Sequence, residues 1–217
     1  MNFDQARFNM VEQQIRPWKV LDPQVLAVLG DIPREVFTPS QYQFMAYVDE
    51  EIPLGHGQVM LPPRVEARLL HDLELKGTES VLEIGTGSGY LTALLARRAR
   101  EVLSLEIDTG LADSARQHLK RVGIHNARVV QADGSKTPIQ GAPFDAIVLG
   151  GSVAEVPQNL LDQLKVGGRL LAIVGEDPVM QATLYTRLGE RQFRSVHLWD
   201  SAAPALQNFA QPSRFHF

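Results

Sequence analysis

The second half of the chain alternates between two kinds of hydrophobic pattern. Short apolar runs rich in β-branched residues recur, and between them lie segments whose apolar residues repeat every three or four positions. In YLTALLARRA (90–99), for example, Leu91, Leu94 and Leu95 fall on one helical face. The same criteria predict strands over residues 80–85, 101–107, 127–133, 144–150 and 168–175, and further helices over 111–122 and 156–164. Strands alternating with helices predict a doubly wound, mostly parallel Rossmann-like α/β sheet with helices on both faces.

The first 79 residues follow a different pattern. Between Pro33 and Pro63 the chain is rich in proline and aromatic residues and has no regular hydrophobic period. Asp22 followed by Pro23 predicts the start of a helix, because aspartate is a preferred N-cap and proline suits the first helical position. We therefore expect residues 1–79 to form an extension of helices and loops folded over the sheet.

The C-terminal part contains two further strand candidates, 182–188 and 193–199. We expect the aromatic residues Trp199, Phe209, Phe215 and Phe217 to pack mainly against the core. The chain is thus predicted to form a single domain over residues 1–217. Its three parts are the N-terminal extension (1–79), a core (80–175), and C-terminal strands with a tail (176–217).

A glycine-rich segment, EIGTGSG, lies where the first predicted strand meets its helix. Gly85, Gly87 and Gly89 would let the backbone approach a ligand closely, and the helix N-terminus offers free N–H groups. The dinucleotide pattern G-x-G-x-x-G fails because its last position is Tyr90, and no Gly-Lys-Ser/Thr follows as in a P-loop. The segment therefore predicts a cofactor site that is neither a dinucleotide-binding site nor a P-loop.

Three acidic residues fall near the ends of three successive predicted strands, namely Glu83, Glu106 and Asp133. Ligands of doubly wound sheets bind at these carboxyl ends, where Glu106 would accept the hydroxyl protons of a ribose and Asp133 would meet an adenine amino group. An acidic site suits a cationic nucleoside, and S-adenosyl-L-methionine is such a ligand. The expected cofactor-binding residues are Glu83, Gly85, Thr86, Gly87, Ser88, Gly89, Glu106, Ile107, Asp133 and Gly134.

The composition narrows the remaining classes of function. A net charge of -4 gives no electrostatic reason to expect a nucleic-acid partner. No apolar run approaches the length that spans a bilayer. The chain has no cysteine, and its histidines form no metal-binding spacing, so we expect no metal site. We expect a cytoplasmic protein, monomeric or homodimeric, that acts on a protein, peptide or small-molecule acceptor.

Several segments together resemble the protein-L-isoaspartate O-methyltransferase family. They are MVEQQIRP (10–17), IPREVFTP (32–39), AYVDEEIPLGHGQ (46–58), VLEIGTGSGYLTALLA (81–96) and PFDAIVLGGSVAEVP (143–157). The resemblance implies that Glu83, Gly85 and Gly87 contact the methionine part of the cofactor, Glu106 the ribose and Asp133 the adenine end. It also implies methylation of the α-carboxylate of L-isoaspartyl residues, which starts the repair of aged proteins.

The chain departs from this family in the segment that the resemblance assigns to the acceptor site. Val59 and Leu61 stand where the family usually carries a threonine and a serine, and the resemblance implies that the serine helps to hold the substrate carboxylate. His56 and Gln58 are then the candidate catalytic residues, with Ser152 as another possible donor. Two alternatives remain open: a divergent methyltransferase that acts on a more apolar acceptor, and a catalytically silent protein that binds S-adenosyl-L-methionine.

Overall fold

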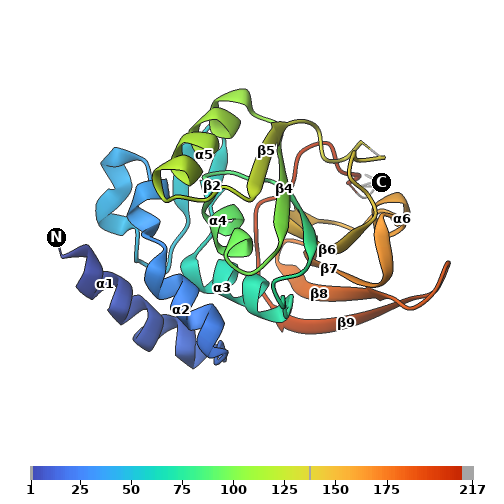
Figure 1. The fold of residues 1–217 in the computed structure, drawn as a ribbon, viewed down its shortest axis with the longest axis horizontal. Coiled ribbons are helices and arrows are strands. Elements are labelled where there is room, and N and C mark those ends of the chain that lie inside the picture. The colour runs from blue at the N-terminus through green and yellow to red at the C-terminus, as the bar shows by residue number, and fades with distance from the viewer. Residues whose placement is uncertain (1, 137, 212–217) are drawn as a thin grey trace, which may run out of the picture.

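A seven-stranded sheet forms the centre of the computed structural model, which describes residues 2–136 and 138–211 (Figure 1). Its strand order is β5-β4-β3-β6-β7-β8-β9. The first five strands in this order run parallel, whereas β8 and β9 pair antiparallel at one edge. The mostly parallel sheet predicted from the sequence is confirmed. The strands are β3 (Ser80–Ile84), β4 (Glu101–Glu106), β5 (Ala127–Gln131), β6 (Phe144–Val153), β7 (Leu164–Glu176), β8 (Val179–Arg187) and β9 (Phe193–Asp200).

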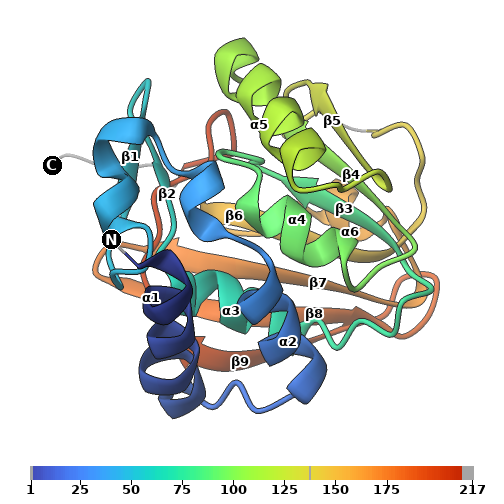
Figure 2. The same ribbon diagram turned by 60° about the vertical axis from the view of Figure 1, so that its left-hand side comes forward.

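Alternate residues of the strands enter two separate hydrophobic cores, one on each face of the sheet. Val81 belongs to the core shared with α1 to α5, and Leu82 belongs to the opposite core, which includes α6 and Phe209. Figures 1 and 2 show the same division, with α6 alone on its side. The helices around the sheet are α3 (Pro63–Asp72), α4 (Tyr90–Ala96), α5 (Thr109–Arg121) and α6 (Gln158–Leu161). Because both faces are covered, apolar residues of the central strands β3 and β6 are buried on both sides of the sheet.

Element boundaries differ from the prediction mainly around β6 and β7. The helix predicted over 156–164 is shortened to α6, because the chain already pairs as a strand from Leu164, which lies opposite Phe144 of β6. Strand β6 extends to Val153, three residues beyond the predicted end, while β5 ends at Gln131. These shifts arise from pairing between strands, which the local hydrophobic period does not encode.

The N-terminal extension contains the expected helices and one unexpected hairpin. Asp22 caps α2 as predicted, with its carboxylate accepting the N–H of Gln24 at 2.7 Å. The helical elements are α1 (Phe3–Met10), a π-helical turn (Val11–Ile15), 3-10 turns (Arg16–Trp18, Arg34–Phe37 and Ser40–Met45) and α2 (Pro23–Asp31). The antiparallel hairpin of β1 (Ile52–Gly55) and β2 (Gln58–Met60) was expected to be a loop. Its strands are too short to show an alternating pattern.

Arg34 joins this extension to the rest of the molecule from a fully buried position. Its guanidinium forms an ion pair with Glu66 of α3 and donates a hydrogen bond to the carbonyl of Leu61 at 2.5 Å. It also lies over the ring of Tyr90, at the start of α4, with 4.7 Å to the ring centroid. A buried charge requires such partners, so Arg34 fixes the segment between β2 and α3 against α4.

The C-terminal aromatic residues that the structure describes pack as expected. Trp199 on β9 donates its indole N–H to Asp72 at 2.6 Å, and the guanidinium of Arg68 lies 5.1 Å from its ring centroid. Phe209 is buried in the α6 core. Phe215 and Phe217 lie outside the described residues.

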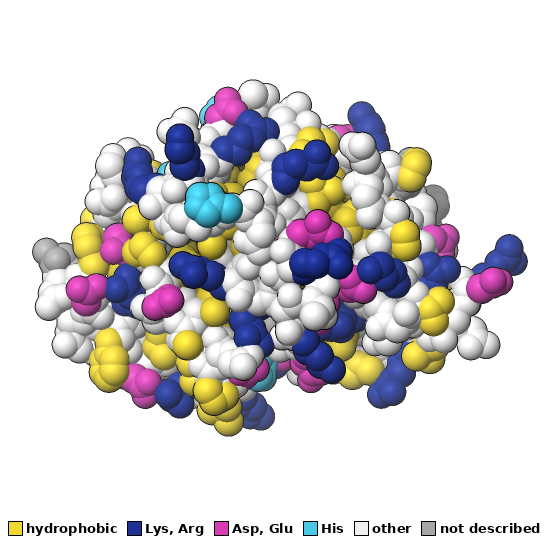
Figure 3. Space-filling model, viewed as in Figure 1, with side chains coloured by type: hydrophobic (Ala, Val, Ile, Leu, Met, Phe, Trp, Pro, Cys, Tyr) yellow, Lys and Arg dark blue, Asp and Glu magenta, His cyan; other side chains and the backbone are white. Residues whose placement is uncertain are grey.

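Two further features concern the surface and the helices. Lysine and arginine side chains are interspersed with acidic ones on the face shown in Figure 3. Among the described residues, no helix is both long enough and apolar enough to cross a membrane.

Glu83 is fully buried in the middle of the sheet. Its Oε2 accepts hydrogen bonds from Ser104 of β4, at 2.6 Å, and from Thr92 of α4. Burial raises the pKa of Glu83 to about 8; the two hydroxyl donors oppose this shift, and the nearby Glu66 and Glu106 add to it. The side chain is therefore mostly protonated at neutral pH and links β3 to β4 and α4 as a neutral group.

We predict that Glu83 makes the protein less stable as the pH rises. The unfolded chain loses this proton near the ordinary value of 4.5, whereas the folded chain keeps it up to about pH 8. The free energy of unfolding should therefore fall across this window. Glu83→Gln, which stays neutral, should flatten the fall when thermal unfolding is followed from pH 5 to pH 8. Glu190→Gln, at an exposed position, is the control and should keep the original profile. Identical profiles for Glu83→Gln and the unaltered chain would show that Glu83 is ionised in the fold.

Candidate functional site

A cavity opens at the carboxyl ends of the parallel strands, where the strand order reverses between β3 and β6. It encloses about 720 Å³ of space, including the part open to solvent. Residues from the ends of β3, β4, β5 and β6 form its floor, and β2, α3 and the C-terminal segment form its other walls. This is the position expected for a ligand of a doubly wound sheet.

The glycine turn after β3 forms the centre of the floor. Gly85 has a φ of 92°, and a Cβ there would lie 2.8 Å from the side chain of Leu206, so only glycine fits without displacement. Gly89 has a φ of 86° and packs against Ala115 of α5, where a Cβ would lie only 3.1 Å away from the alanine Cβ. Gly85 thus keeps backbone open to a ligand, while Gly89 serves the contact between α4 and α5.

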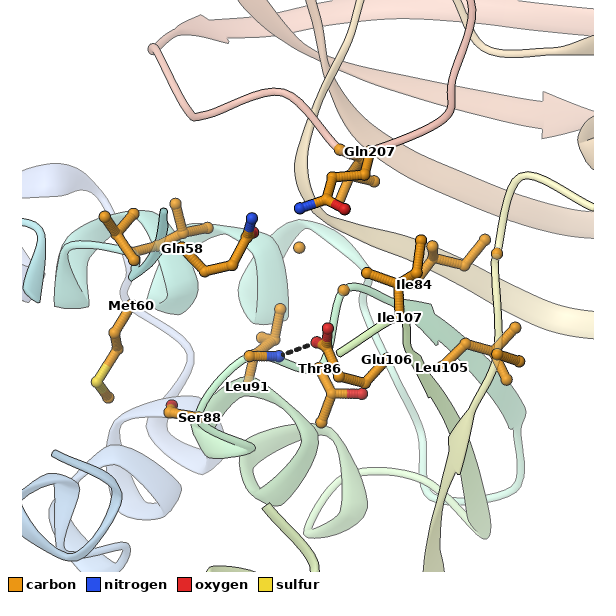
Figure 4. Close-up of a pocket in the computed structure, with 18 of the residues that line it drawn as sticks. Gln58, Met60, Ile84, Thr86, Ser88, Leu91, Leu105, Glu106, Ile107 and Gln207 are labelled. Atoms are coloured by element: carbon orange, nitrogen blue, oxygen red, sulfur yellow. Dashed lines mark hydrogen bonds between the residues drawn. The ribbon is translucent and has the colours of Figure 1, made fainter. Parts of the chain in front are cut away.

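Glu106 is held rigidly at the end of β4. One carboxylate oxygen accepts the N–H of Gly87 at 2.8 Å and the other accepts the N–H of Asp108 at 3.0 Å. Figure 4 shows the bond between Glu106 and the glycine turn, with the carboxylate facing the cavity. Each oxygen retains a lone pair, so the carboxylate can accept two further protons from adjacent hydroxyl groups.

Asp133 follows β5 on the same side of the cavity. Its carboxylate accepts hydrogen bonds from both the N–H and the hydroxyl of Ser135, at 3.0 and 2.7 Å, and from the amide of Asn208 at 2.9 Å. Burial would raise the pKa of Asp133, but these donors and Lys136 outweigh it and lower the pKa below its usual value. Asp133 is therefore an ionised group whose position is fixed by both the β5 loop and the C-terminal segment.

The electrostatic character of the cavity is acidic. Glu106 and Asp133 line it, Glu66 lines it as the ion-pair partner of the buried Arg34, and no lysine, arginine or histidine does so within residues 2–136 and 138–211. The same part of the chain contains no cluster of residues suited to a metal ion. Such a site disfavours a polyphosphate and favours a ligand with positive charge and hydroxyl groups.

The structure brings most of the predicted site residues together. Those that line the cavity are Gln58, Gly85, Thr86, Gly87, Ser88, Glu106, Ile107, Asp133 and Gly134. Glu83 and Gly89 lie behind the floor and do not line it. His56 is 68% exposed on the outer turn of the hairpin, where its Nδ1 lies 3.3 Å from a carboxylate oxygen of Asp108. It is not among the lining residues either.

Several lining residues were not predicted from the sequence. Glu66 lies on the buried stripe of α3, and the combination of an acid in an apolar helix face with an arginine in IPREVF could have indicated it. Leu206, Gln207 and Phe209 come from a segment that has no regular period and lies far from the glycine turn in sequence. Nothing in the local sequence marks these three residues.

Comparisons with known proteins agree with this geometry. The family model described as protein-L-isoaspartate(D-aspartate) O-methyltransferase matches residues 5–198. Protein-L-isoaspartate O-methyltransferase 1 of Rhodopseudomonas palustris (strain HaA2) is 45% identical over 180 residues, which cover 83% of this chain and 74% of the relative. The protein-L-isoaspartate O-methyltransferase of Syntrophus aciditrophicus is 40% identical over 188 residues, covering 87% and 86%.

Similar solved structures support the fold. A Plasmodium falciparum chain assigned to the protein-L-isoaspartate O-methyltransferases, in complex with S-adenosyl-L-homocysteine, superimposes with a TM-score of 0.77 at 21% identity. The alignment covers 95% of this chain and 99% of the other. A second protein-L-isoaspartate O-methyltransferase gives a TM-score of 0.79 at 24% identity, covering 93% of this chain and 66% of the other. The match of the family model and the identity to the relatives show that this chain belongs to the protein-L-isoaspartate(D-aspartate) O-methyltransferase family.

Proposed function

We propose that this chain transfers a methyl group from S-adenosyl-L-methionine to the α-carboxylate of L-isoaspartyl residues in proteins and peptides. The observation that carries the proposal is the rigid Glu106 carboxylate beside an open glycine turn in an acidic cavity. Family membership supports the reaction, and relatives at 40–45% identity bear the name of this activity. The same family membership disfavours the two alternatives, which are a methyl acceptor of another chemical class and a protein that binds the cofactor without catalysing a reaction.

The donor would be held by the floor of the cavity. Glu106 has free lone pairs for a ribose diol, and Asp133 with Gly134 lies at the neighbouring strand end, where an adenine would sit. The backbone of the turn from Gly85 to Gly87 would face the methionine part. When bound, the sulfonium supplies an electrophilic methyl group whose positive charge suits the acidic lining. Glu83 lies behind this floor, so we expect it to act by supporting the turn rather than by contact.

The acceptor would enter along the N-terminal extension. Val59, Met60 and Leu61 present an apolar wall to the cavity, and Leu61 is held in place through its carbonyl by Arg34. A carboxylate acceptor is already ionised at neutral pH and needs no strong general base. The chain must then align the nucleophile with the methyl group and exclude water from the site. The apolar wall contributes to the exclusion of water. The cytoplasmic location expected from the sequence stays a prediction.

Glu106→Gln should weaken the binding of S-adenosyl-L-homocysteine roughly ten- to hundredfold, because hydrogen bonds to a charged group contribute about 1.5–3 kcal/mol. Isothermal titration calorimetry measures this directly. Glutamine can still accept the Gly87 N–H, which limits damage to the turn. Glu101→Gln, at the exposed opposite end of the same strand, is the matched control and should bind normally. Equal affinity for the two variants would rule out the proposed contact with the ribose.

Methyl transfer from radiolabelled S-adenosyl-L-methionine should label an L-isoaspartyl peptide and not the same peptide with a normal aspartyl residue. The difference is expected because the site must align one particular carboxylate with the methyl group. Base-labile radioactivity in the isoaspartyl peptide alone is the expected result. Labelling of neither peptide, by a chain that binds S-adenosyl-L-homocysteine, would contradict the proposed acceptor and leave the donor site intact.

A further inference from the structure

A carboxylate acceptor faces an electrostatic difficulty in this cavity. Glu106 and Asp133 already line it as carboxylates, and its wall at Val59 and Leu61 offers no side-chain donor. A carboxylate that is removed from water without hydrogen-bond donors is strongly disfavoured. The cavity must therefore supply donors from elsewhere.

Only two of its lining side chains carry N–H groups in the described part of the chain, namely Gln58 and Gln207. The hydroxyl of Thr86 is paired with Ser104 at 2.5 Å, and Ser88 accepts the N–H of Tyr90 at 3.3 Å. Figure 4 places Ser88 at the start of α4, away from Gln207. The two carboxamides are thus the side-chain N–H donors of the cavity, and Ser88, which still has its own O–H to donate, lies away from Gln207.

Gln58 is placed by the hairpin. It is the first residue of β2 and lies opposite Gly55 across the turn, so its backbone is fixed by antiparallel pairing. Its side chain extends over the cavity from the side of the N-terminal extension (Figure 4). Among the described residues, its carboxamide has no hydrogen-bond partner.

Gln207 is placed by residues 201–209, which we call the C-terminal strap. On one side of Gln207, the N–H of Leu206 donates to the carbonyl of Ser152 at 2.8 Å, and the Ser152 N–H donates to the carbonyl of Pro204 at 2.8 Å. On the other side, the amide of Asn208 donates to Asp133 at 2.9 Å. The strap is therefore anchored to β6 and to the β5 loop immediately before and after Gln207, which holds that residue at the mouth of the cavity.

The two carboxamides face one another across the mouth of the cavity in Figure 4. That of Gln207, like that of Gln58, has no hydrogen-bond partner within the described residues. We propose that Gln58 and Gln207 together hold the acceptor carboxylate, with Gln207 supplying the donor that the apolar residues at positions 59 and 61 do not. This inference rests on the proposed function, because it assumes an anionic acceptor. Because the backbones of both residues are already fixed, only their side chains have to be ordered when a carboxylate binds.

Substitution of Gln207 in the full chain tests this role. Gln207→Ala should raise the KM for an L-isoaspartyl peptide about tenfold or more, because it removes a hydrogen bond to a charged group. Gln207→Glu has the same shape but adds a negative charge, so its KM should rise further. Gln58→Ala should resemble Gln207→Ala. The matched controls are Gln211→Ala and Gln211→Glu, which change an exposed glutamine beyond the last lining residue of the strap.

In the Gln207 and Gln58 variants, the affinity for S-adenosyl-L-homocysteine and the kcat should stay close to those of the unaltered chain. A substitution that disordered the strap would instead change these two quantities as well. A KM for the Gln207 variants equal to that of the Gln211 variants would overturn the inference and leave the proposed function standing. Loss of S-adenosyl-L-homocysteine binding in both Gln207 variants would overturn it as well, because the strap would then serve the donor. Failure of the unaltered chain to methylate the peptide would overturn both proposals.

Discussion

The buried guanidinium of Arg34 is the interaction on which the arrangement of the site depends. It binds the carboxylate of Glu66, the carbonyl of Leu61 and the ring of Tyr90, which belong to α3, to the segment after β2 and to α4. A charge in this position has no water to solvate it, so the loss of one of these partners would destabilise the fold. The N-terminal extension is thereby held as one wall of a cavity whose floor belongs to the sheet.

The floor and the mouth of the cavity must bind groups of opposite charge. Glu106 and Asp133 make the floor negative, which suits a sulfonium donor. The acceptor is itself an anion, so it requires donors at the mouth, where Gln58 and Gln207 lie. Between them, Val59 and Leu61 exclude water without adding charge. In this arrangement the usual hydroxyls of the family are replaced by carboxamides on two segments that are far apart in the sequence, β2 and the strap.

The sequence predicted those parts of the fold and of the site that depend on a local pattern of residues. Apolar runs alternating with helical periods predicted the parallel sheet, and an acid beyond a strand, such as Glu106, could be placed at the carboxyl edge because parallel strands end together. Contacts between segments that are distant in the chain could not be predicted from the sequence. The local pattern of EIGTGSG could not show that Glu83 points into the core rather than the cavity, because that depends on Ser104 and Thr92. The position of Gln207 depends on anchors to Ser152 and Asp133, which no local period encodes.

A crystal structure of the chain with S-adenosyl-L-homocysteine and an L-isoaspartyl peptide would test this division between floor and mouth directly. The predicted result is a ribose diol within hydrogen-bond distance of Glu106, with the peptide α-carboxylate between the carboxamides of Gln58 and Gln207. A carboxylate bound elsewhere, with both carboxamides directed at solvent, would contradict the assignment of the mouth. A nucleoside that makes no contact with Glu106 would contradict the assignment of the floor.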